Sequence, residues 1–292
     1  MIDLPGTHSK RMYFANSSYE DSRYVIFGAP FDSTCTFRKG TRYGPSGIRE
    51  ASHNFESFML EYELDLLDID ICDYGDLDVT HLSPSEMVER INGFSKRLVA
   101  DGKFPLLLGG EHSVSPGCAV AFDDVTVLGI DAHADFYDDF DDDRNNHACA
   151  MRRIADKFGK DRVMWIGIRQ MGRAEYEAAP KVINSFKIFE NGIDWTISEI
   201  EKMVGNGRLY ISLDIDGIDP AYAPGTGTPV PFGLRPIDVK RIIDHFASRL
   251  VGFDIVEVSP PLDNGVTAVL AANILMEVIA AVHLRASEEK KG

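Results

Sequence analysis

Short apolar segments that end abruptly in polar residues recur along the whole chain, and they constrain the fold more than any other feature. Between them lie helix-like stretches such as 83–102, where Ser83 is an N-cap candidate and Glu86 follows three residues later. Segments that are apolar on both faces and alternate with helices are typical of a covered parallel sheet. The sequence therefore predicts a three-layer α/β/α fold with a mostly parallel central sheet. Its expected strands lie within residues 23–32, 104–113, 125–135, 162–170, 208–219 and 250–261.

No repeat, linker or low-complexity stretch interrupts this pattern, so we expect residues 1–292 to form one domain. The chain carries 46 acidic and 30 basic residues, a formal net charge of −16. This balance argues against a nucleic-acid partner, which needs a basic surface, and is compatible with a cationic small molecule. The four cysteines form no closely spaced pair, as expected for free thiols in a reducing compartment.

The sequence contains no convincing membrane signal. Its first fourteen residues lack the apolar core of a signal peptide. The longest apolar stretch, 268–284, is interrupted by Asn273 and Glu277, which favours a buried or amphipathic helix over a membrane span. We therefore expect a cytoplasmic protein that binds neither a membrane nor a nucleic acid.

Three of the apolar segments end in residues that bind metals. Side chains at alternate positions of a strand project to the same side, and ligands of parallel sheets bind beyond the carboxyl ends of the strands. Four carboxylates and two imidazoles are thus expected to face one pocket, where the carboxylates stay ionised only beside cations. The candidate metal ligands are His112, Asp131, His133, Asp135, Asp214 and Asp216.

The chemistry of these side chains indicates which ions they bind. Oxygen ligands with some imidazole suit Mn²⁺ better than a structural zinc, and six ligands exceed the needs of one tetrahedral ion. Two ions about 3.5–4 Å apart, sharing a carboxylate, are the natural interpretation. An isolated Asp-x-Asp is more often a turn or a solvated strand end, so the prediction depends on the combination of motifs. A two-metal phosphoesterase is another candidate, but the Lys or Arg that it needs is not evident near the motifs.

Three motifs, GGEHS at 109–113, DAHAD at 131–135 and SLDIDGIDPAYAPGTGTP at 212–229, resemble the signatures of the ureohydrolases, the family of arginases and agmatinases. Segments 28–49 and 254–263 resemble the flanking regions of that family, so the resemblance covers nearly the whole chain. It implies an α/β/α fold, two Mn²⁺ ions and a homo-oligomer, a trimer or hexamer. One ion would be bound by His112, Asp131, Asp135 and Asp214, and the other by His133, Asp131, Asp214 and Asp216, with Asp131 and Asp214 bridging. Glu111 replaces an Asp that is common in the family.

The resemblance also implies a reaction, the hydrolysis of a guanidinium group. Water activated by two metal ions attacks the central carbon, and the leaving amine must then be protonated. His147 is the candidate proton donor, and the alternative is a solvated loop histidine. Asp135 is expected to take part in catalysis as well as in metal binding.

Glu257 is the candidate that binds the substrate guanidinium, because it ends an apolar segment and a carboxylate there needs a partner. In the family the matching Glu has this role. A structural ion pair with Arg169 or Arg49 is the alternative.

The loop between DAHAD and His147 suggests the substrate. Arginases have neutral polar residues there that bind the α-carboxylate of arginine, whereas this chain has Tyr137 and a run of acids. An EF-hand is excluded because Arg144 stands where Gly is required. We expect agmatine, which ends in an ammonium group, to be cleaved to putrescine and urea, a step of polyamine biosynthesis. Alternatives are a simply solvated loop, an arginase, a guanidinobutyrase or related guanidino-acid hydrolase, and a metal-binding homologue without turnover. The acids are Asp138, Asp139, Asp141, Asp142 and Asp143.

Overall fold

An eight-stranded sheet forms the centre of the computed structural model, which describes residues 10–79 and 81–289. The strand order is β4-β1-β5-β10-β9-β6-β7-β8, and every neighbouring pair is parallel. A separate antiparallel pair consists of β2 (Phe58–Met59) and β3 (Leu64–Asp65). The strands of the large sheet are β1 (Tyr24–Ala29), β4 (Ile71–Asp76), β5 (Phe104–Gly109), β6 (Thr126–Ile130), β7 (Val163–Ile168), β8 (Lys181–Asn184), β9 (Leu209–Asp214) and β10 (Leu250–Val256).

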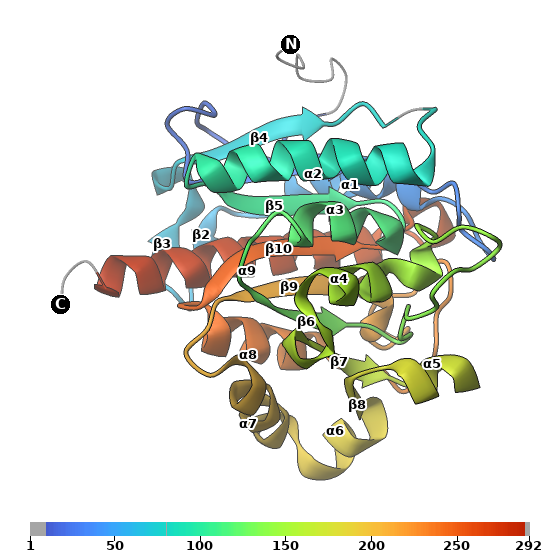
Figure 1. Ribbon diagram of the computed structural model, residues 1–292. Helices are drawn as coiled ribbons and strands as arrows, with labels where there is room; N and C mark the ends of the chain where they lie inside the picture. Colours follow the sequence, from blue (N-terminus) through green and yellow to red (C-terminus); the bar gives the residue numbers. More distant parts are fainter. Residues whose placement is uncertain (1–9, 80, 290–292) are drawn as a thin grey trace.

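Helices cover both faces of this sheet (Figure 1). On one face lie α2, α3 and α4, and on the other lie α1, α7, α8 and α9. The helices are α1 (Gly44–Ser52), α2 (Pro84–Ala100), α3 (Ser115–Ala119), α4 (Ala150–Phe158), α5 (Arg173–Ala178), α6 (Ser185–Asn191), α7 (Ile193–Val204), α8 (Pro236–Phe246) and α9 (Val266–Glu289).

Alternating side chains of the central strands pack in two separate hydrophobic cores, one on each face of the sheet. In β5, Leu106 and Leu108 pack in the cluster that contains Ile48 of α1. Leu107, between them, points to the opposite face and packs in the cluster that contains Met87 of α2. Successive strand residues point to opposite faces, so a strand between two helical layers must be apolar throughout. The predicted three-layer α/β/α fold with a parallel sheet is confirmed.

All six predicted strand segments contain strands, namely β1, β5, β6, β7, β9 and β10. The helix predicted within 83–102 is α2, and its capping box is present: Ser83 Oγ accepts the N–H of Glu86, and Glu86 Oε2 accepts the N–H of Ser83 at 2.8 Å. The predicted strands do not include β4 and β8, the two edge strands of the sheet.

The apolar stretch 268–284 lies within α9, which packs against α1 and α8. Among the described residues, Val266–Ser287 is the one helical segment long and apolar enough to cross a membrane, and 67% of its apolar window is buried inside the protein. A core helix of an α/β fold has the same length and composition, so the expectation of a buried helix is confirmed. Residues 1–9, on which the expected lack of a signal peptide mostly depends, lie outside the described residues.

Candidate metal centre

The four central strands bring the predicted site residues to one edge of the sheet. Their spatial order is β5-β10-β9-β6, and all four run in parallel, so their carboxyl ends lie side by side. His112 follows β5, Glu257 follows β10, Asp214 ends β9 and Asp131 follows β6. Residues up to 145 positions apart in sequence therefore meet, as in the hydrogen bond from the His112 N–H to Glu257 Oε1 at 2.8 Å.

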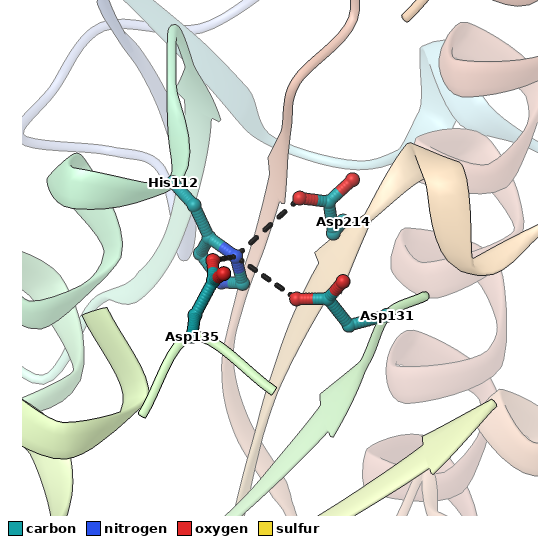
Figure 2. Close-up of side chains that lie close together, drawn as sticks. All are labelled: His112, Asp131, Asp135 and Asp214. Atoms are coloured by element: carbon teal, nitrogen blue, oxygen red, sulfur yellow. Dashed lines mark ion pairs between the residues drawn. The ribbon is translucent and has the colours of Figure 1, made fainter. Parts of the chain in front are cut away.

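One group of ligands converges on His112 (Figure 2). Its Nδ1 lies 2.9 Å from Asp135 Oδ2, 3.1 Å from Asp131 Oδ2 and 3.4 Å from Asp214 Oδ2. All four side chains are buried, and the possible ligand atoms lie within 4.8 Å of one another. Three carboxylate oxygens and one imidazole nitrogen thus enclose a space of the size that one metal ion needs.

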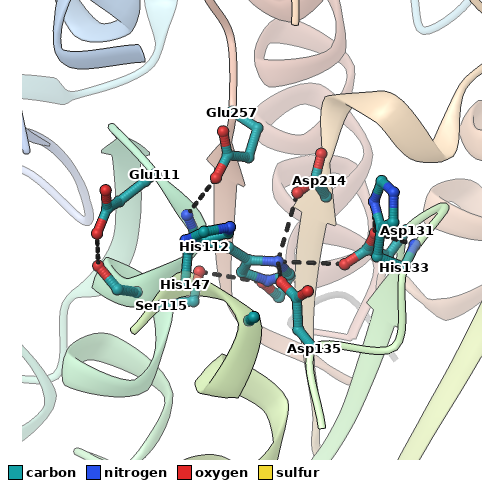
Figure 3. Close-up of polar contacts among 12 residues, drawn as sticks. Glu111, His112, Ser115, Asp131, His133, Asp135, His147, Asp214 and Glu257 are labelled. Atoms are coloured by element: carbon teal, nitrogen blue, oxygen red, sulfur yellow. Dashed lines mark hydrogen bonds and ion pairs between the residues drawn. The ribbon is translucent and has the colours of Figure 1, made fainter. Parts of the chain in front are cut away.

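A second group lies beside the first and shares Asp131 (Figure 3). His133 Nδ1 is 3.0 Å from Asp216 Oδ2 and 3.7 Å from Asp131 Oδ1. Asp131 therefore presents one oxygen to each group, as expected for a bridging ligand. Asp214 Oδ2 belongs to the first group, and its Oδ1 accepts the N–H of Asp216 at 2.9 Å. That Asp214 also bridges to the second ion stays a prediction.

Two buried atoms at this site lack a hydrogen-bond partner among the described residues: His112 Nδ1 and Asp131 Oδ2. They are only 3.1 Å apart, close enough for an ion pair but not oriented as a hydrogen bond. Buried polar atoms without partners are rare because each costs free energy. A cation between these atoms satisfies both, so the residues present fit a divalent metal ion.

Burial and nearby charges perturb the pKa values of Asp131 and His133. Burial raises the pKa of Asp131 to about 7, and repulsion from Asp135 and Asp216 adds to the effect. Burial would lower the pKa of His133, but its attraction to Asp216 and Asp131 outweighs burial and raises the pKa to about 11. Carboxylates this close require protons or metal cations beside them to balance their charge.

Two of the site residues have backbone conformations that side chains other than glycine rarely adopt. Asp135 has a φ of 49° and Glu257 a φ of 61°, both in the left-handed region. Such strain is tolerated where surrounding contacts hold it, and it clusters at functional sites. For Asp135 these contacts include its carbonyl oxygen, which accepts the N–H groups of Met151 and Arg152 at the start of α4.

Glu257 makes neither of the ion pairs considered as alternatives. Arg49 instead pairs with Asp73 and Asp76, and the guanidinium of Arg169 donates to backbone carbonyls, including that of Val230. Glu257 is 7% exposed, and burial raises its pKa well above the ordinary value, with repulsion from Glu111 adding to the effect. Among the described residues, its side chain accepts one hydrogen bond, through Oε1, which leaves Oε2 available to a bound guanidinium.

His147 is half-buried at the start of a short 3-10 helix, η4 (His147–Cys149), on the same edge of the sheet. It contacts Thr34, whose hydroxyl accepts the His147 N–H at 2.9 Å and lies 3.2 Å from Nδ1. The predicted site residues did not include Thr34. They also did not include Ser212 and Asp254, which lie behind His112; a carboxylate inside the apolar strand β10 was the signal for Asp254.

The acidic loop is only partly available to a substrate. Asp138 is within ion-pair distance of Arg144, Arg152 and Arg153, so its charge is already balanced. A tight turn joins Phe140 to Asp143, and the two acids between them have positive φ. Three acids of this loop are exposed and have no ion pair among the described residues: Asp139, Asp141 and Asp142.

Comparisons with known proteins agree with this geometry. Residues 22–281 match the sequence model of the Arginase family. The N(1)-aminopropylagmatine ureohydrolase of Thermococcus kodakarensis is 34% identical over 90% of this chain and 92% of its own, and the guanidinobutyrase of Pseudomonas aeruginosa is 33% identical over 90% and 86%. The crystal structure of the agmatine ureohydrolase of Thermoplasma volcanium superposes with a TM-score of 0.92, at 41% identity and 97% coverage of both chains. The chain therefore belongs to the arginase family.

Proposed function

We propose that this protein is a manganese-dependent ureohydrolase that converts agmatine and water to putrescine and urea. The observation that carries the proposal is the pair of ligand groups joined by Asp131. Proteins of the arginase family depend on two metal ions, and a donor set of carboxylates with imidazole suits Mn²⁺. Relatives that act on agmatine or its aminopropyl derivative support the choice of substrate.

The residues of the first group, His112, Asp131, Asp135 and Asp214, would hold one ion, and those of the second group, His133, Asp131 and Asp216, would hold the other. When bound, the ions supply an activated water and positive charge for the tetrahedral intermediate. Asp135 is 7% exposed and uses Oδ2 toward His112, so its second oxygen would accept a hydrogen of the attacking water.

Glu257 and His147 would act on the substrate itself. Glu257 Oε2 would accept N–H groups of the guanidinium, an interaction that a buried carboxylate makes strongly. His147 would give a proton to the leaving amine and thereby prevent it from recombining with the carbonyl carbon. Together these residues orient the central carbon toward the metal ligands and complete the reaction.

Charge at the mouth of the site favours a substrate with a second cation. The exposed carboxylates of Asp139, Asp141 and Asp142 attract the terminal ammonium of agmatine and repel the α-carboxylate of arginine. The three arginines around Asp138, namely Arg144, Arg152 and Arg153, already interact with acidic groups, because each of them also contacts Asp156. An arginase and a guanidino-acid hydrolase are the alternatives that the substrate test must distinguish.

The test is urea release by chelator-stripped, Mn²⁺-reloaded protein with agmatine, L-arginine and 4-guanidinobutyrate. We expect turnover of agmatine at least about tenfold above the others, a discrimination of about 1.4 kcal/mol. The triple variant D139N/D141N/D142N should narrow this preference, because it removes the repulsion of a carboxylate. The matched control E56Q/D68N/D123N neutralises three exposed acids outside this loop and should not change the preference. A preference for arginine in the unaltered protein would refute the choice of substrate.

Glu257→Gln isolates the proposed contact with guanidinium. We expect it to lower kcat/KM for agmatine by about two orders of magnitude, since a charged hydrogen bond contributes about 1.5–3 kcal/mol. The number of Mn²⁺ ions bound per chain should stay at two.

A trimeric or hexameric assembly and a cytoplasmic location stay predictions. Size-exclusion chromatography with light scattering would test the assembly, and cell fractionation would test the location.

A further inference from the structure

A chain of polar contacts leads from Glu111 through Thr34 to His147 and joins three segments at the carboxyl edge of the sheet. Thr34 lies in the loop after β1, Glu111 follows β5, and His147 begins η4. Neither Glu111 nor Thr34 belongs to the groups of possible metal ligands. Their contacts therefore require a different explanation.

Glu111 is fully buried and all its acceptor positions are used. Its Oε2 accepts the N–H groups of Thr34 at 2.8 Å and Cys35 at 3.0 Å. Its Oε1 accepts the hydroxyl groups of Thr34 and Ser113, each at 2.6 Å. A carboxylate has about four acceptor sites, and four donors fill them. Glu111 is therefore an acceptor only, and the hydroxyl hydrogen of Thr34 must point toward it.

This direction determines what Thr34 Oγ1 can do toward His147. The hydroxyl has one hydrogen and two lone pairs. The hydrogen goes to Glu111, and one lone pair accepts the His147 backbone N–H at 2.9 Å. The second lone pair faces His147 Nδ1 at 3.2 Å, and this contact is favourable only if Nδ1 carries a hydrogen. Bare Nδ1 would place two lone pairs against each other.

We propose that Glu111 and Thr34 are positioning residues that fix the ring orientation and tautomer of His147, with a hydrogen on Nδ1, so that Nε2 is the atom that exchanges a proton with the reacting amine. The inference rests on the proposed function, in which His147 protonates the leaving group. Nε2 makes no hydrogen bond to any residue in the part of the chain that the structure describes, so it is free to face a substrate.

The proton balance is simple. Before the step both ring nitrogens carry hydrogen and the imidazolium donates Nδ1–H to Thr34. The Nε2–H bond then breaks as the amine nitrogen forms its new N–H bond, and His147 is left neutral with its hydrogen on Nδ1. The contact with Thr34 is the same before and after, so the ring needs no rotation between the two states. Water returns the proton to Nε2.

Thr34→Val tests the proposal, because valine has nearly the same shape and lacks the hydroxyl. We expect kcat for agmatine to fall about 10- to 100-fold, a part of the 10²–10⁴-fold that a general acid contributes. KM and the two Mn²⁺ ions bound per chain should change less than twofold. Thr34→Ser should restore kcat to within about threefold. Thr36→Val, at an exposed threonine two residues along the same loop, is the matched control and should have no effect.

A double-mutant cycle separates positioning of His147 from general damage to the fold. Thr34→Val should lower kcat in the wild-type background and have no further effect in His147→Gln, because the residue then has no imidazole to orient. Glu111→Gln should resemble Thr34→Val, with Mn²⁺ binding checked because Glu111 adjoins His112. If Thr34→Val lowered kcat by the same factor in the wild-type and His147→Gln backgrounds, the proposal would be overturned.

Nitrogen NMR observes the tautomer directly. In ¹⁵N-histidine protein loaded with diamagnetic Mg²⁺, the signals of His147 are assigned as those lost in His147→Gln. When the ring is neutral, they should show a hydrogen on Nδ1 and a bare Nε2. The inference would be refuted if the hydrogen lay on Nε2 instead and Thr34→Val left kcat unchanged. If His147→Gln still lowered kcat, the proposed role of His147 would stand and only this inference would fail. Full activity of His147→Gln would refute both the role of His147 and the inference that depends on it.

Discussion

Removal of the hydroxyl of Ser212 should weaken metal binding, although this side chain contacts no metal ion. His112 Nε2 lies 3.2 Å from Ser212 Oγ, on the far side of the ring from the ligand atom Nδ1. Ser212 Oγ in turn donates to Asp254 Oδ1 at 2.7 Å. Since Nδ1 must be bare to bind a metal, Nε2 carries the hydrogen and donates it to Ser212.

The size of the effect follows from the surroundings of Asp254. This carboxylate is fully buried and also accepts hydroxyl groups from Ser115 at 2.9 Å and Tyr210 at 2.7 Å. A hydrogen bond coupled to a buried charge contributes about 1.5–3 kcal/mol, and groups that support metal-bound histidines affect affinity by about 10- to 100-fold. Because about 1.4 kcal/mol is tenfold in affinity, the two estimates agree. We expect Ser212→Ala to raise the Kd for Mn²⁺ by about 10- to 100-fold.

The assay is titration of chelator-stripped protein with Mn²⁺, with the free ion measured by electron paramagnetic resonance. Circular dichroism must show that the variant is folded, because the network also joins β9 and β10. Ser185→Ala is the matched control, since the Ser185 hydroxyl is buried at the start of α6 and has no hydrogen-bond partner among the described residues. A folded Ser212→Ala protein that binds Mn²⁺ within twofold of the wild type would refute the reasoning.

Three further predictions concern stability. Arg49→Ala should lower the free energy of unfolding in urea by about 3–5 kcal/mol, because it leaves the buried carboxylate of Asp73 without its ion pair; Lys10→Ala, which breaks an exposed pair with Glu50, should cost less than about 1 kcal/mol. Hydrogen bonds from Arg249 lower the pKa of Glu201 to about 2 in the folded protein. The ionised Glu201 therefore stabilises the fold above the pKa that it has in the unfolded chain, and this stabilisation is lost as the pH falls from about 4.5 to 2. The Glu201 side chain is about a third exposed, so solvent screening limits this stabilisation to about 0.5–1 kcal/mol. In thermal melts, the Tm of Glu201→Gln should fall less between pH 4.5 and 2 than the Tm of the wild type. Chelation should lower the Tm, and added Mn²⁺ should restore it; an unchanged Tm in calorimetry would contradict a metal bound only by the folded state.

The strands that sequence analysis found and those it missed differ in their place in the sheet. The six that it found include all strands with neighbours on both sides, and these are buried on both faces, as in β5 and β9. The two that it missed, β4 and β8, are the edges. In β4 the apolar run is interrupted by Asp73, which pairs with Arg49, and β8 has only four residues. An apolar run marks a strand between two helical layers, and an edge strand need not have one.

The cluster of candidate metal ligands was predictable for a similar reason, since each of these residues lies at or just beyond the carboxyl end of a buried strand. Their division into two groups came from the resemblance to the family and not from the pattern of apolar segments, because it depends on strand order: β5 and β6 follow one another in sequence but are separated in the sheet by β10 and β9. The residues that contact the candidate site residues from behind were harder still to predict. Thr34 lies in a loop whose path no periodicity predicts, and its contact with His147 joins residues 113 positions apart. The single domain formed by residues 1–292 stays a prediction. It is supported by one large sheet that contains both β1, its first strand in sequence, and β10, its last.

The carboxylates of the centre are held by the backbone as well as by their neighbours. Asp131 Oδ1 accepts the N–H of His133 at 2.6 Å, and Asp216 Oδ1 accepts that of Ala132 at 3.0 Å. In Asp214, Oδ1 likewise accepts a backbone N–H, while Oδ2 faces His112. Each bond fixes the plane of a carboxylate and aims its other oxygen into the shared space, so side-chain freedom is already lost when an ion arrives. The same short turns that follow the strands therefore supply both the ligands and the donors that orient them, which explains why alternate acidic residues stand where the apolar segments end.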